Sequence, residues 1–114
     1  MLEEELLELV KRVTSQKCEK QHIELKRASG GTPSKLYYTL SSFSNQVGGG
    51  IIIFGIDEDA GYKVAGVYDA QELQKKVLEQ SLQMEPVVRP LFTVVQIEDK
   101  LVVSAEISEC DIYD

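Results

Sequence analysis

The sequence predicts an α+β domain, a mixed and mostly antiparallel sheet with helices packed on it, in the chain order α-β-α-β-β-α-β-β. Three patterns indicate this fold: apolar residues at helical spacing in three segments, one continuous apolar run of strand length, and two alternating segments joined by a short turn near the end. With 114 residues, of which 43% are hydrophobic, we expect one folded domain over residues 1–114.

The chain is expected to begin with a helix and a strand. Apolar residues recur at intervals of three and four over residues 2–16, and the acidic first turn of this segment suits the helix dipole. Residues 22–27 alternate polar and apolar, which is typical of a half-buried strand. The alternation places His22, Glu24 and Lys26 on the polar face of that strand.

A second helix and a central strand should follow. Thr32 and Pro33 are typical of an N-cap and a first helical residue, and Gly48-Gly49-Gly50 ends the helical pattern. The side of this helix that packs on the sheet is predicted to be lined by Leu36, Leu40, Phe43 and Val47. Residues 51–56 form a continuous apolar run between turn signals, which predicts a strand covered on both faces.

The second half of the chain is predicted to contain a short strand, a helix and a hairpin. Residues 62–67 follow an acidic turn at 57–61 and could pair with the central strand. Asp69 and Glu72 have the spacing of a capping box, which predicts a helix to about Met84, stopped by Pro86. The terminal hairpin is expected from residues 91–98 and 101–106, joined by Asp99 and Lys100.

The charge of the chain is unevenly distributed. The net charge of −7 argues against a generic nucleic-acid binder, since most such domains carry a basic excess. Residues 11–35, however, hold seven lysines and arginines against two glutamates, so this window has a net charge of +5. Distant charges are screened beyond about 8 Å, so a basic segment on an acidic body remains compatible with a local phosphate-binding face.

The glycine-rich segments do not have the form of a nucleotide site. Residues 48–50 follow a helix and enter a strand, which is the reverse of the dinucleotide-binding arrangement. Residues 30–35 lie between a strand and a helix but lack the spacing of a P-loop. A phosphate bound near Ser34 and Lys35 is a minor hypothesis beside an ordinary helix cap.

Three carboxylates could form a catalytic metal site. Glu19 precedes the first strand, Glu24 lies on its polar face, and Asp57 or Asp59 follows the central strand. If the two strands are neighbours, these groups could converge on Mg²⁺ or Mn²⁺, as metal-assisted phosphodiester cleavage requires. The alternative is a solvated acidic face with ion pairs to Lys26 and Arg27.

Four short motifs together resemble a known family. They are Ile23-Glu24-Leu25-Lys26-Arg27, the segment from Leu40 to Gly50, Ile52-Ile53-Phe54-Gly55-Ile56-Asp57-Glu58-Asp59, and Val64-Ala65-Gly66-Val67. Their order and spacing resemble the AlbA-like, Schlafen-core family, whose members are predicted to bind DNA. The likeness covers about residues 17–107, and it implies that Phe43 packs under the sheet while Asn45 caps the second helix.

The resemblance also implies a biological setting. Such domains occur in prokaryotic transcriptional regulators ahead of further domains, so we expect this chain to be the N-terminal domain of a longer protein, with those downstream domains as partners. In Schlafen proteins the same core cleaves transfer RNA with two glutamates five residues apart and an aspartate near the end of the central strand. Glu19, Glu24 and Asp57 match those positions, and a single lobe would have to dimerise to act in this way.

Three hypotheses therefore stand side by side. The first is a noncatalytic DNA-binding module of a transcriptional regulator, without a cofactor, whose phosphate contacts are Lys17, Lys20, Lys26, Arg27 and Lys35. The second is a metal-dependent ribonuclease that uses Glu19, Glu24 and Asp57 with Mg²⁺ or Mn²⁺. The third is a protein-interaction or dimerisation domain. DNA or RNA is the expected ligand and a homodimer the expected assembly. No segment has the length of a membrane helix, and we expect a cytoplasmic protein.

Overall fold

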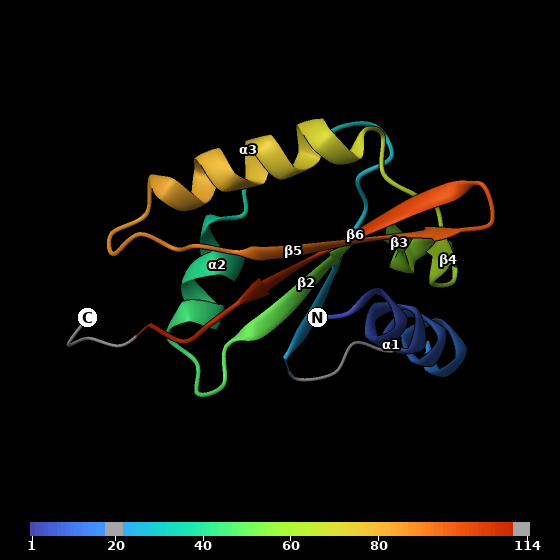
Figure 1. Cartoon of the computed structure of the whole chain (residues 1–114), viewed down its shortest axis with the longest axis horizontal. Coiled ribbons are helices and arrows are strands. Elements are labelled where there is room, and N and C mark those ends of the chain that lie inside the picture. The colour runs from blue at the N-terminus through green and yellow to red at the C-terminus, as the bar shows by residue number, and fades with distance from the viewer. Residues whose placement is uncertain (18–21, 111–114) are drawn as a thin grey trace.

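The computed structural model describes residues 1–17 and 22–110 of the chain. A four-stranded sheet in the order β1-β2-β6-β5 separates two layers of helices, with α1 on one side and α3 on the other (Figure 1). The elements are α1 (Glu3–Gln16), β1 (Ile23–Lys26), α2 (Tyr37–Ser44), β2 (Gly50–Phe54), β3 (Ile56–Asp57), a short 3-10 helix (Glu58–Ala60), β4 (Lys63–Val64), α3 (Ala70–Leu82), β5 (Leu91–Ile97) and β6 (Lys100–Ile107).

The pairing of the strands confirms the predicted mixed, mostly antiparallel sheet. β1 pairs with β2 in parallel, with Glu24 opposite Ile52 and Lys26 opposite Phe54. β6 lies between β2 and β5 and is antiparallel to both. β6, the last strand of the described chain, therefore lies inside the sheet. One of its neighbours, β2, comes much earlier in the chain, and the other, β5, directly precedes it.

Each face of the sheet has its own hydrophobic cluster. Side chains of α1 pack on one face against Leu25, Ile53 and Val102. On the other face, α2 and α3 pack against Ile52, Phe54 and Val103. β2 is covered on both faces, as its continuous apolar run predicts, because Ile52 and Ile53 point to opposite layers and neither is exposed.

The helices α1 and α3 follow the sequence pattern closely. α1 begins one residue later than predicted, and the Glu5 side chain accepts a hydrogen bond from the Leu2 N–H at 2.9 Å. α3 begins after Asp69, whose carboxylate accepts from the Glu72 N–H at 3.0 Å. Its buried residues include Leu73 and Val77, which belong to the cluster on that face of the sheet. None of the described helices is long and apolar enough to span a bilayer.

The start of the second helix differs from the prediction. α2 begins at Tyr37 rather than Pro33, because the backbone of residues 33–36 is bound by α3 instead. The Gln80 side chain donates to the Pro33 carbonyl at 3.0 Å and accepts from the Leu36 N–H at 3.3 Å. The Pro33 carbonyl would accept from residue 37 in a helix that began at Pro33, so the contact with Gln80 replaces the first helical turn.

The prediction that Val47 packs against the core is wrong, since this side chain is 82% exposed. α2 ends at Ser44 with Asn45 as its C-cap, and Phe43 is the last residue of the helix that belongs to the cluster beneath the sheet. Gly48 and Gly49 then turn the chain into β2 with φ angles of 83° and 68°. The role of Asn45 and the burial of Phe43 are as the family resemblance implied.

The central apolar run is interrupted before its last residue. Gly55 has a φ of 114° and ends β2, so Ile56 begins a separate two-stranded sheet in which β3 pairs with β4. The expected pairing of residues 62–67 is therefore with this continuation of the strand, not with β2 itself. The last hairpin turns at Glu98 and Asp99, one residue earlier than predicted, and Glu98 takes a left-handed φ of 59°.

Candidate nucleic-acid interface

Two of the predicted cations lie at the end of the edge strand β1. Lys26 forms an ion pair with Glu24 at 3.5 Å, and both side chains are about one-third exposed. Arg27 is exposed, and its Nε donates to the Ser29 hydroxyl at 3.1 Å. The side chain of Lys26 is thus engaged within the chain, whereas most of the Arg27 guanidinium donors remain available to an anion.

The loop that follows β1 is hollowed beside Arg27. Arg27, Gly30, Gly31, Thr32, Pro33 and Ser34 line an open hollow of about 420 Å³. A Cβ atom at Gly30 or Gly31 would meet nothing within 4 Å, and Gly30 is exposed and Gly31 half-buried, so the space beside both glycines is open. Lys35 follows directly and is exposed. An anion in this hollow would meet a guanidinium and accessible main chain.

Contacts from distant parts of the chain hold this loop in place. The Thr32 and Tyr68 hydroxyls are hydrogen-bonded at 2.7 Å, and the Tyr68 N–H donates to the Ala28 carbonyl at 2.8 Å. Gln80 holds the other end of the loop through Pro33 and Leu36. Tyr68 and Gln80 are therefore positioning residues that the sequence analysis missed. No local pattern marks them, because they lie 36 and 47 residues from their partners.

The remaining predicted cations lie elsewhere or outside the described residues. Lys17 is the C-cap of α1 and is exposed on the opposite layer of the sheet from Lys35, which leads into α2. Lys20 lies outside the residues that the structure describes. The structure therefore brings Arg27 and Lys35 to one loop, next to Lys26, and it places Lys17 on the α1 layer.

The predicted metal ligands are only partly within the described chain. Glu19 lies outside it, Glu24 is paired with Lys26, and the Asp57 carboxylate accepts from the Asp59 N–H at 3.1 Å at the start of the 3-10 helix. Within residues 1–17 and 22–110, no three His, Cys, Asp or Glu side chains are close enough together to hold a metal ion. The ion pair of Glu24 is the one expected for the solvated-face alternative, and the three-carboxylate site stays a prediction.

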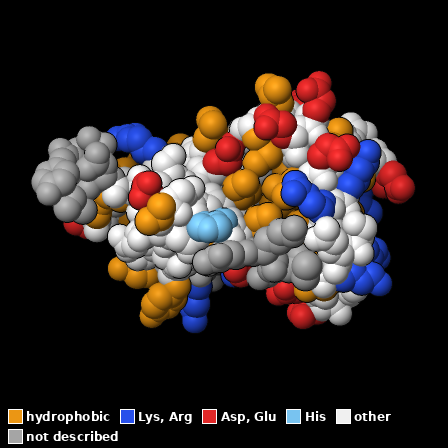
Figure 2. Space-filling model, turned by 90° about the horizontal axis from the view of Figure 1, so that it is seen from below, with side chains coloured by type: hydrophobic (Ala, Val, Ile, Leu, Met, Phe, Trp, Pro, Cys, Tyr) orange, Lys and Arg blue, Asp and Glu red, His pale blue; other side chains and the backbone are white. Residues whose placement is uncertain are grey.

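The α1 side of the molecule has a different character. Seen from that side, acidic and basic side chains are interspersed, and apolar side chains lie beside the histidine (Figure 2). A hollow of about 410 Å³ there is lined by residues that include His22, Arg12, Glu106 and Ile51. Because a cation and a carboxylate share its wall, this hollow lacks the single sign of charge that attracts a polyanion.

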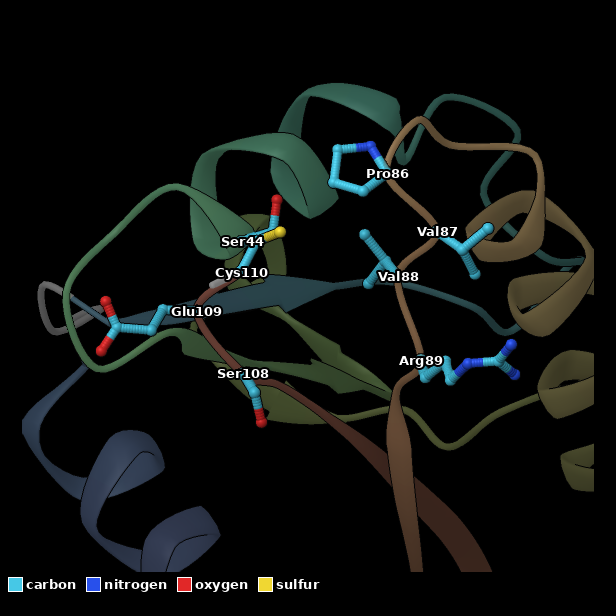
Figure 3. Close-up of a pocket in the computed structure, with 8 residues that line it drawn as sticks. All are labelled: Ser44, Pro86, Val87, Val88, Arg89, Ser108, Glu109 and Cys110. Atoms are coloured by element: carbon cyan, nitrogen blue, oxygen red, sulfur yellow. The ribbon is translucent and has the colours of Figure 1, made fainter. Parts of the chain in front are cut away.

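A third hollow lies between segments next to the open end of the last hairpin. It has a volume of about 490 Å³ and is formed by Ser44, residues 86–89 before β5 and residues 108–110 after β6 (Figure 3). Arg89 and Glu109 are on its two walls, and their side chains extend away from each other. Its charged groups therefore do not converge on one point as a ligand site requires.

Comparison with known proteins agrees with the motifs and the fold. A family model described as "Schlafen, AlbA_2" matches residues 19–113. The chain belongs to this family. The Schlafen, AlbA_2 match thus confirms the resemblance drawn from the four motifs. No curated protein matches the chain.

Two solved structures share the fold of this AlbA_2 domain. The N-terminal domain of a RecG-related protein from Nitrosomonas europaea, determined by solution NMR, has a TM-score of 0.74 and 24% identity, covering 93% of this chain and 74% of that one. A crystal structure of a protein from Corynebacterium diphtheriae has a TM-score of 0.60 and 17% identity, covering 94% of this chain and 26% of that one. At these identities the likeness concerns the fold alone.

Proposed function

We propose that this AlbA_2 domain binds nucleic acid, with DNA as the first ligand to test, through the loop of residues 27–35. The observation that supports it most is the hollow lined by the exposed Arg27 together with two glycines that have open space beside them. Arginine can bind a phosphate through two parallel hydrogen bonds, and exposed main-chain N–H groups add further donors. Lys35, which follows the hollow, adds a second cation for a neighbouring phosphate.

The way in which the loop is held supports the same proposal. Gln80 and Tyr68 fix both ends of the loop to the folded body, so Arg27 and the glycines keep one geometry before a ligand arrives. A site that is already ordered loses less conformational entropy on binding. The RecG-related protein is named for a DNA helicase, which is consistent with a nucleic-acid ligand for a domain of this fold.

The charge of the whole chain sets the expected strength of binding. A net charge of −7 repels a polyanion at long range, so binding should depend on the local cations and weaken steeply with salt. A role in a transcriptional regulator and a homodimer belong to the same proposal. Two copies would present two such loops to one duplex.

The direct test is fluorescence anisotropy of labelled duplex DNA, single-stranded DNA and transfer RNA, titrated with the protein at low and near-physiological salt. We expect affinity to fall with salt, and the slope of log K against log salt to become shallower by about one for Arg27→Ala and for Lys35→Ala. Lys11→Ala removes an exposed cation from α1 and is the matched control. The proposal fails if no ligand binds at low salt, or if the loop variants bind as the control does.

The same titrations separate binding from cleavage. Transfer RNA incubated with the protein and Mn²⁺ should stay intact if the domain is noncatalytic. Cleavage that is abolished by Glu24→Ala and by Asp57→Ala would instead support the metal-dependent ribonuclease predicted from the sequence. Cleavage that survives both substitutions would point to a contaminating enzyme.

A further inference from the structure

The two edges of the sheet are protected in different ways. β1, at one edge, is four residues long and carries Glu24 and Lys26. β5, at the other edge, is seven residues long with the sequence LFTVVQI, which contains no charged residue. Proteins usually protect edge strands with charges, prolines, bulges or short length, because a long apolar edge pairs readily with another strand. β5 has none of these devices within its length.

The hydrogen-bonding groups on the outer side of β5 can be identified from the hairpin register. A hairpin with a two-residue turn closes with a hydrogen-bonded pair, which here is Ile97 and Lys100. The N–H and C=O groups of alternate residues, Phe92, Val94 and Gln96, therefore point away from β6. In the described part of the chain, no backbone hydrogen bond outside the strand ladders involves these three residues.

Several apolar side chains on the α3 side of the sheet are partly exposed. Phe92 and Val94 pack against the α2 and α3 cluster and remain partly exposed. On α3, Leu78 and Leu82 are 39% and 43% exposed. Both lie about 200° around the helix from Gln80, because each residue turns an α-helix by about 100°. Gln80 contacts the loop that leaves β1, so Leu78 and Leu82 lie on the flank that faces away from the β1 edge.

We propose that the occupant of this edge is a second copy of the same chain, with the two β5 strands paired antiparallel about a two-fold axis at Val94. In this register Val94 faces Val94 of the other copy, and Phe92 faces Gln96. All three outward residues of each strand then form hydrogen-bonded pairs, which joins two four-stranded sheets into one. An antiparallel pair of identical strands is closed, so the assembly stops at a dimer.

Charge complementarity favours a second copy in this orientation. Arg89 precedes β5, and Glu98 and Asp99 follow it. The register about Val94 brings Arg89 of each copy to the end of the other strand where Glu98 and Asp99 form the hairpin turn. Two carboxylates and the single cation of Lys100 lie at that end, so a cation meets a net negative turn at both ends of the apolar pair. A parallel pairing would instead place like charges together at each end, which is unfavourable.

The sharpest experiment uses the two-fold axis itself. In a homodimer, Val94→Lys and Val94→Glu each place two like charges opposite one another at the axis. In a heterodimer formed from the two variants, a lysine faces a glutamate at the same place. By sedimentation equilibrium without nucleic acid, we expect the native chain to be a dimer. Each variant should dimerise at least about tenfold more weakly, and their equimolar mixture should recover a heterodimer. Circular dichroism and thermal unfolding establish that each variant is folded.

Surface charges give a second test that leaves the core untouched. Arg89→Glu and Asp99→Arg should each weaken the dimer, and the double variant should restore it because the pair is only reversed. Lys11→Glu makes the same change in charge as Arg89→Glu on the exposed side of α1 and should have no effect. Amide exchange gives an independent signature, since the Phe92, Val94 and Gln96 N–H groups should become protected as concentration rises.

The inference names the interface of the homodimer that is part of the proposed function, but its outcomes are separate from those of nucleic-acid binding. A chain that is monomeric at millimolar concentration would overturn it, and so would a dimer that Val94→Lys, Arg89→Glu and Asp99→Arg leave unchanged. Open-ended aggregation of the native chain would also overturn it, because the two-fold pairing closes. Loss of DNA binding with an intact dimer would contradict only the proposed function.

Discussion

Two adjacent glycines between α2 and β2 have very different surroundings. Both take left-handed φ angles, but a Cβ at Gly48 would meet nothing within 4 Å, whereas one at Gly49 would lie 1.9 Å from the Ile107 carbonyl oxygen. The sequence shows these glycines only as the end of a helical pattern. It gives no sign that one of them also allows the chain to pass against β6, since that contact joins residues 58 positions apart.

We therefore expect Gly49→Ala to destabilise the fold far more than Gly48→Ala. Gly48→Ala should lower the free energy of unfolding by about 1–2 kcal/mol, the cost of a left-handed residue with a side chain. Gly49→Ala adds a backbone clash that only movement of β6 can relieve. Urea unfolding of both variants measures the difference, and equal losses would show that β6 shifts at little cost.

The N-cap of α3 is a residue that the sequence identifies correctly. Asp69→Ala removes the acceptor for the Glu72 N–H and should lower the free energy of unfolding by about 1 kcal/mol. Asp69→Asn keeps a side-chain oxygen in place and is the matched control, with a smaller loss. Thermal unfolding monitored by circular dichroism compares them. A loss as large for asparagine as for alanine would mean that the charge matters more than the hydrogen bond.

At the scale of elements, the sequence patterns work where local signals and burial agree. α3 combines a cap, a buried stripe and Pro86, and β2 combines an apolar run with flanking glycines, so both form close to where predicted, although β2 ends at Phe54 and α3 at Leu82. The start of α2 does not, because Thr32 and Pro33 are valid start signals that lose to a contact with Gln80 on α3. The sequence predicts Val47 on the buried side only because the helical pattern continues past Ser44, where the helix itself ends.

The loop of residues 27–35 should therefore depend on α3 for its order. Gln80→Ala removes two hydrogen bonds and should lower the free energy of unfolding by about 1–2 kcal/mol. It should also speed amide exchange across the loop and weaken DNA binding without removing any cation. Gln83→Ala, at the exposed end of α3, is the control. Unchanged exchange in the Gln80 variant would show that Tyr68 alone holds the loop.

At the scale of the whole molecule, the sequence predicts the class of fold but not the order of its strands. The polar face of β1, with Glu24 and Lys26, is visible in the sequence as alternation. That β1 and β5 form the two edges follows from long-range pairing, which no local pattern encodes. The candidate site shows the same division, since Arg27 and Lys35 stand out by charge, and Tyr68 and Gln80 do not.

The pairing predicts that the fold is complete only when β6 is present. A chain truncated after Asp99 lacks Val102 from one cluster and Val103, Ala105 and Ile107 from the other. We expect this fragment to show no cooperative thermal unfolding, because β1 and β2 alone form a two-stranded pair, which is marginal in water. A control that removes only residues 111–114 should unfold cooperatively. Cooperative unfolding of the shorter fragment would contradict the prediction.

The central place of β6 also has a consequence during synthesis. A ribosome makes β1 and β2 first, and for about fifty residues after β2 the inner edge of that pair has no strand to receive it. The nascent chain thus carries a hydrophobic strand edge until residues 100–107 emerge. Chaperones that bind extended apolar segments should therefore recognise the stretch around Ile51, Ile52 and Ile53, and release it once the last hairpin inserts.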